Sequence, residues 1–128
     1  MTRPGHRIGP ALLCLCLLAI ALHVYVGLFE WTVSVFSMAI VAWSLVPYVI
    51  SVVVASATGR QVFGVVPAFL ALVLDAYTFI AVRFLSHGST AALAYLWVPF
   101  WNLVIVLPLG IAAALLWVKL RHASQRAL

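Results

Sequence analysis

The sequence predicts an all-α integral membrane protein, a four-helix bundle built from two antiparallel transmembrane hairpins. Of its 128 residues, 67% are hydrophobic and only 7% are charged, and the mean hydropathy is +1.25. A soluble domain carries about 25% charged residues. The chain therefore lacks the polar surface that water requires, and we expect a single transmembrane domain that lies almost wholly in the bilayer.

Four apolar segments are long enough to cross a membrane, which takes about 20 mostly apolar residues. The predicted spans are residues 10–28, 32–57, 65–85 and 91–118, followed by a basic tail at 119–128. Glu30, close to Gly27, indicates a tight turn between the first two spans. Gly88 suits the end of the third helix, and Ser89 or Thr90 suits the cap of the fourth.

The basic residues predict the orientation. With four spans, six of the seven fall on one side of the membrane: Arg3, Arg7, Arg60, Lys119, Arg121 and Arg126. Only Arg83 falls on the other. Because cytoplasmic loops carry the excess of Lys and Arg, we expect both termini in the cytoplasm of a bacterial inner (plasma) membrane. These residues flank apolar helices and form no patch with interleaved aromatics, so the expected partner is the lipid bilayer and not nucleic acid.

The N-terminal segment has a second interpretation. Its first 21 residues have a basic start, an apolar run and small residues at Ala19 and Ala21, as in a cleaved signal peptide. However, the apolar run continues through "LHVYVGLF" at residues 22–29. This continuation favours an uncleaved first span that keeps its partner in the first hairpin.

Small and polar residues predict how the helices pack, because helices in lipid associate through close contacts and hydrogen bonds. In the second span, four such residues recur at intervals of seven: Ser37, Ser44, Ser51 and Thr58. The third span carries a matching stripe with alternating steps of four and three: Gly64, Ala68, Ala71, Asp75 and Thr78. A heptad spacing suits helices that cross left-handed at about +20°, so we predict a seam between these two spans.

An intramembrane polar cluster is expected near the bilayer centre. At about 1.5 Å per residue, Ser44, Asp75 and Asn102 lie within one turn of the same depth. Tyr48 lies one turn deeper, and His23 lies nearer the outer surface. These five residues form the predicted cluster.

Asp75 is the residue of this cluster that needs most explanation. An acid at a helix centre costs about 2.5–3.5 kcal/mol to insert, whereas Val, Leu, Ile and Phe contribute about −0.3 to −0.6 kcal/mol each. The third span has twelve such residues between Val65 and Leu85, so it still inserts. Asp75 then needs a partner or a proton, and four roles follow: a hydrogen-bonded pin, a contact with another membrane protein, proton or cation transport, or a cofactor or catalytic role.

The sequence gives little support for an enzyme. Its only two acids, Glu30 and Asp75, lie at different depths. Cys14 and Cys16 are two apart on a helix and point to different sides. There is no H-x-x-x-H motif, nucleophile turn or phosphate loop. We therefore expect no catalytic residue, no metal and no cofactor.

The C-terminal half of the chain carries a resemblance. Its residues are Asp75, Ser89-Thr90-Ala91-Ala92, Pro99, Trp101-Asn102 and Pro108-Leu109-Gly110. In these it resembles small uncharacterised bacterial four-span inner-membrane proteins, and the resemblance implies no activity. Small multidrug transporters share the length, the four spans and a single buried acid, but their acid lies in the first span, where this chain has His23.

The expected function is therefore non-enzymatic. The chain would serve as an accessory or interaction subunit, bound to another membrane protein or to itself as a homo-oligomer, or as a protective membrane factor. The alternative is a small oligomeric transporter that couples to protons or cations through Asp75.

Overall fold

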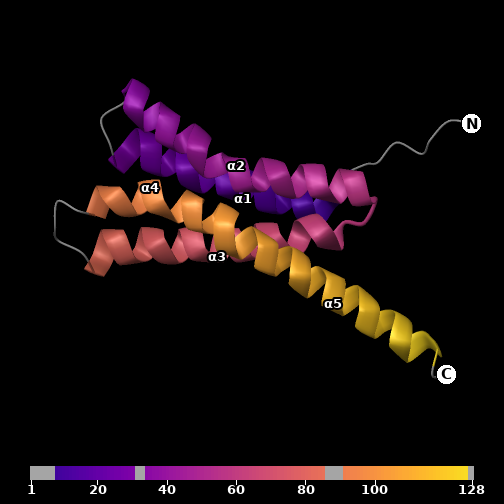
Figure 1. The fold of residues 1–128 in the computed structure, drawn as a ribbon. Coiled ribbons are helices and arrows are strands. Elements are labelled where there is room, and N and C mark those ends of the chain that lie inside the picture. The colour runs from indigo at the N-terminus through magenta and orange to yellow at the C-terminus, as the bar shows by residue number, and fades with distance from the viewer. Residues whose placement is uncertain (1–7, 31–33, 86–90, 127–128) are drawn as a thin grey trace, which may run out of the picture.

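The computed structural model describes residues 8–30, 34–85 and 91–126, and these are helical almost throughout (Figure 1). These residues form five α-helices and three π-helical segments. In chain order the elements are α1 (Pro10–Tyr25), η1 (Val26–Glu30), α2 (Val35–Thr58), α3 (Val62–Ile80), η2 (Ala81–Leu85), α4 (Ala91–Trp101), η3 (Asn102–Val106) and α5 (Leu107–Arg126). Within these residues there is no strand.

Joined through the π-helical segments, these elements make four helices that are long and apolar enough to cross a membrane. The qualifying stretches are Pro10–Leu28, Val35–Thr58, Val62–Phe84 and Leu93–Gln125. The predicted fold class, all-α with four apolar spans, is confirmed for this part of the chain.

Some helix ends differ from the predicted limits. The third helix begins at Val62, before the predicted start of the span at residue 65. The fourth continues to Arg126, so most of the basic tail predicted for 119–128 is helical. The first span stays helical through Glu30, where a turn was predicted. The predicted helix signals at Gly88, Ser89 and Thr90 lie outside the described residues.

Local sequence explains where the first two spans start and stop. Pro10 occupies the first turn of α1, where its missing N–H costs nothing. At the start of α2, Ser34 and Ser37 form a capping box, in which each side chain accepts from the other residue's backbone N–H. Gly59 ends α2 with φ of 66°, a left-handed conformation that favours glycine.

Helix α3 is the central element of the bundle, because it contacts α1, α2, α4 and α5. In Figure 1, the start of α1, the end of α2, the start of α3 and the end of α5 lie at one end of the bundle. We call this the Gly59 end. The opposite end, where α1 ends and α2 begins, is called the Ser34 end. These names carry no assignment to a side of the membrane.

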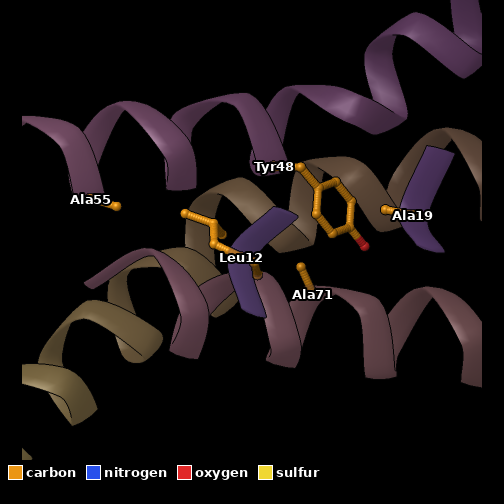
Figure 2. Close-up of a cluster of buried hydrophobic side chains, with 6 residues drawn as sticks. Leu12, Ala19, Tyr48, Ala55 and Ala71 are labelled. Atoms are coloured by element: carbon orange, nitrogen blue, oxygen red, sulfur yellow. The ribbon is translucent and has the colours of Figure 1, made fainter. Parts of the chain in front are cut away.

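The core is made mainly of small side chains, which let the helix backbones approach closely. Figure 2 shows the Tyr48 ring between Ala19 of α1 and Ala71 of α3, with Leu12 and Ala55 nearer the Gly59 end. A β-carbon built on Gly64 would lie 2.6 Å from the Ser51 carbonyl oxygen and 2.7 Å from Ala55 Cβ. This half of the bundle is therefore closely packed.

The fourth span diverges from the bundle in its second half: the first turns of α5 pack on α3, and its later turns extend away from the other helices (Figure 1). Pro99, the π-helical segment η3 and Pro108 lie where the direction changes, and both prolines and π-bulges bend helices. A β-carbon on Gly110 would lie 2.6 Å from Pro67 Cα, so α5 touches α3 just beyond the bend. Only 11% of the most apolar window of the fourth span is buried, against 28–33% in the others.

Candidate functional site

Asp75 lies on the inward face of α3, with only 4% of its side chain exposed. Every member of the predicted stripe on this helix is buried, namely Gly64, Ala68, Ala71, Asp75 and Thr78. Because α3 is surrounded by the other spans, the Asp75 carboxyl group points to where those helices meet. The site is built around this group.

Each carboxyl oxygen of Asp75 accepts a hydrogen bond from a different span. The Tyr48 hydroxyl of α2 donates to Oδ2 over 2.5 Å, and the Asn102 side-chain amide of η3 donates to Oδ1 over 2.7 Å. Two donors aimed at two oxygens make a setting that suits a carboxylate.

His23 of α1 completes the contacts from all three other spans. Its Nδ1 lies 2.8 Å from the Ala19 carbonyl oxygen. Because a carbonyl can only accept, Nδ1 must carry a hydrogen. Its Nε2 lies 3.4 Å from Asp75 Oδ2. His23 is 11% exposed, so the pair is largely removed from solvent and lipid.

Asn102 is wholly buried at the first position of η3. Its backbone carbonyl accepts from the Leu107 N–H, five residues ahead, which defines the π-helical turn. Its side-chain oxygen Oδ1 is a buried polar atom with no hydrogen-bond partner among the described residues. The amide is therefore held through its NH₂ group alone, by Asp75.

Ser44 was predicted at the depth of Asp75, but no hydrogen bond joins the two in the described part of the chain. Ser44 instead lines two small cavities on the Ser34 side of Asp75, each of about 10 Å³. Both are lined by His23, Val26, Ser44 and Tyr95, and one also reaches Asp75 and Thr78. A separate, wholly apolar groove of about 260 Å³ lies between α1 and α2, on the other side of Tyr48.

The predicted seam residues take different roles. Ser37 caps α2, Ser51 donates to the Pro47 carbonyl over 2.9 Å, and Thr78 donates to the Leu74 carbonyl over 2.9 Å. All three are buried, as are Ala68 and Ala71. Thr58 differs, because it is exposed at the last position of α2 and donates to the Val54 carbonyl. The buried seam of α2 thus ends at Ala55, one turn before the predicted position.

The assembled site contains His23, Tyr48, Asp75 and Asn102, which we call the carboxyl network. It can hold and share a proton, since a carboxylate and an imidazole nitrogen face each other across 3.4 Å. Within residues 8–30, 34–85 and 91–126, no three His, Cys, Asp or Glu side chains gather around a point where a metal ion would bind. The sequence did not predict the three π-helical segments or the contact between His23 and Asp75.

No protein-family model, curated protein or solved structure matches the chain.

Proposed function

We propose that this chain is a non-enzymatic membrane subunit, in which the carboxyl network fixes the arrangement of four spans and the fourth span binds a partner. The observation that carries the proposal is that Asp75 is contacted by side chains from each of the other three spans. Because both carboxyl oxygens of Asp75 already accept hydrogen bonds within the bundle, they are poorly placed to bind another protein. Its role is then internal, and partner binding falls to another surface.

The proposed topology is two antiparallel hairpins with both termini in the cytoplasm of a bacterial inner membrane. It is supported by the placement of helix ends in Figure 1, where the start of α1 and the end of α5 lie at the same end of the bundle. Arg60 and the basic residues of α5 lie at that Gly59 end. In this topology the Ser34 end is periplasmic.

The partner surface proposed is the exposed face of α5. This helix leaves the bundle while still apolar, and its large exposed side chains include Leu109, Leu116, Trp117 and Leu120. Arg121 lies over the Trp117 ring at 5.4 Å, an arrangement that suits the boundary between lipid and water. The face could receive a helix of another membrane protein or a second copy of the chain.

A photo-crosslinking amino acid tests the interaction role. We would place it at Leu116 of α5 and, as a control, at Val53 of α2; their exposed fractions are 59% and 58%. Crosslinks to protein in the native membrane are expected from Leu116 and not from Val53. If both positions capture only lipid, the subunit role fails and a protective membrane factor, which needs no protein partner, becomes the better assignment.

Proton-coupled transport is the second candidate, and the observation that favours it is the buried pair of His23 and Asp75. Transport would require an oligomer, because the Gly59 half of one bundle is filled by Leu12, Ala55 and Ala68. Proton-driven flux in liposomes that is abolished in Asp75→Asn, with the fold retained, would establish this alternative. No flux under any cation gradient would remove it.

A further inference from the structure

The geometry of the carboxyl network points to a proton-binding site with access from one side. We propose that His23 and Asp75 together hold a single proton, and that it exchanges with water through the two cavities at the Ser34 end and not through the Gly59 end. This inference does not depend on the subunit role, because a subunit or a transporter could carry such a site.

The position of one hydrogen on the His23 ring is fixed by a neighbouring carbonyl. Nδ1 carries a hydrogen because it faces the Ala19 carbonyl at 2.8 Å. In neutral His23, Nε2 is then a bare acceptor, and it faces Asp75 Oδ2 at 3.4 Å. With no further proton, an ionised carboxylate would face a lone pair, which is repulsive. One proton on either group removes this repulsion and leaves the pair without net charge.

The other groups around Asp75 limit where that proton resides. Tyr48 and Asn102 already donate to the two carboxyl oxygens, so the shared proton is left to the contact between His23 Nε2 and Asp75 Oδ2. Removing it leaves a buried, uncompensated negative charge. Adding a second proton gives a protonated acid beside an imidazolium. The singly protonated pair is therefore the stable form.

Among the described residues, few other titratable groups lie near the pair. Cys16 of α1 lies near Tyr48 on the wall of the apolar groove, and Tyr95 of α4 lines the cavities. The first titratable residue of α5 is Lys119, about 25 Å along the helix from Asn102. On the same span as Asp75, Arg83 is two turns nearer the Ser34 end.

The cavities supply the inner part of the route. Each has about 10 Å³, which is about the space that one water molecule needs, provided that polar groups line it. The hydroxyl of Ser44 and the ring of His23 line both cavities, and Asp75 and Thr78 line one of them. A hydronium ion on this side gives its proton to Nε2 and remains as water. The reverse step returns the proton to water.

On the Gly59 side, the described side chains packed next to the pair are apolar. Leu12, Ala55, Ala68 and Ala71 form one buried apolar cluster there, and a β-carbon on Gly64 would lie 2.9 Å from Leu12 Cδ2. Ser51, the polar residue of α2 at this level, uses its hydroxyl to bond the Pro47 carbonyl. A proton leaving toward the Gly59 end would therefore have to cross closely packed apolar side chains.

Asp75 is the only aspartate of the chain, so the experiment can observe it directly. Full-length protein with ¹³C-labelled aspartate carboxyl is reconstituted in liposomes in one orientation, verified by protease access to the tail at Lys119. The carboxyl NMR signal is followed while the pH on one side is stepped between about 8 and about 5. We expect it to shift with pH at the Ser34 end. A pH step at the tail side should have no effect until a protonophore is added.

Three variants test the route and the role of His23. Ser44→Val fills the shared cavity wall and should slow the response, whereas Ser51→Ala on the closed side should leave the rate unchanged. His23→Gln should move the pH range over which the Asp75 signal shifts. A signal that follows pH on both sides, one that shifts at no pH, or a His23→Gln titration identical to wild type would overturn the proposal. Because the main readout uses the wild-type chain, a poorly folding variant does not prevent the test.

Discussion

The Tyr48 hydroxyl donates to Asp75 Oδ2 over 2.5 Å, joining α2 to α3 across 27 residues of sequence. Both side chains are nearly fully buried. A buried polar group that loses its partner at this depth is costly, so each partner depends on the other. This hydrogen bond is therefore expected to stabilise the bundle.

Replacing Tyr48 by Phe should destabilise the protein by roughly 1–2 kcal/mol, because it removes one donor from a buried carboxyl and little else. The measurement is reversible unfolding in mixed detergent. Tyr77→Phe is the matched control, since Tyr77 is 65% exposed on the same bundle. Equal effects of the two substitutions would mean that the hydrogen bond contributes nothing.

The sequence predicted the participants of this site better than their contacts. Counting rise along each helix put Ser44 at the depth of Asp75 and Tyr48 one turn deeper. Side chains, however, lean toward the N-terminus of their own helix. In the antiparallel arrangement we propose, Tyr48 leans toward Asp75, and its length carries the hydroxyl across the gap. Ser44 is short and leans away, into the cavities.

The same reasoning explains His23, which its backbone position places nearer the surface. Helix α1 starts at the Gly59 end (Figure 1), so the ring leans back toward the bilayer centre and Nδ1 meets the carbonyl of Ala19, one turn earlier. The π-helical turn that begins at Asn102 had no sequence signal beyond the prolines that flank it. Four apolar spans, by contrast, follow directly from composition, because few other structures satisfy the backbone in lipid.

Asp75 variants should show whether the contacts made by this acid stabilise the fold. Asp75→Leu leaves Tyr48, Asn102 and His23 without their shared partner and should cost roughly 3 kcal/mol or more. Asp75→Asn keeps an oxygen acceptor and should cost less. We would compare both by unfolding in detergent and by the yield of folded protein.

A double-mutant cycle provides the control for this prediction. Once Asp75→Leu is present, adding Tyr48→Phe should have little further effect, because the hydroxyl has already lost its acceptor. Additive losses from the two changes would show that Tyr48 acts independently of Asp75.

Gly64→Ala should destabilise the contact of α3 with α2 and α1 by roughly 1–3 kcal/mol. The added methyl would lie 2.6 Å from the Ser51 carbonyl oxygen and 2.7 Å from Ala55 Cβ, and neither can move without shifting a helix. Gly9→Ala is the control, because the three atoms nearest to its added methyl all belong to the flexible side chain of Gln61. Thermal unfolding that ranks Gly9→Ala as the more damaging change would contradict the close packing described here.

Two adjacent alanines on α5 test how this helix meets the bundle. Ala114 is fully buried, one turn after Gly110, whereas its neighbour Ala113 is exposed. Ala114→Leu adds three carbon atoms to the contact face and should destabilise the fold by roughly 1–3 kcal/mol or force α5 further from α3. Ala113→Leu adds the same atoms on the exposed face and should stay within about 0.5 kcal/mol of wild type.

Unfolding in detergent gives the stability of both variants, and a distance between spin labels on α3 and α5 reports the separation. In a partner-bound state the exposed face of α5 would also be covered. Ala113→Leu would then weaken crosslinking from Leu116 without loss of stability. Ala114→Leu would lower the stability and leave this crosslinking unchanged. A pair of variants with indistinguishable stability would mean that α5 is not packed on α3 through Ala114.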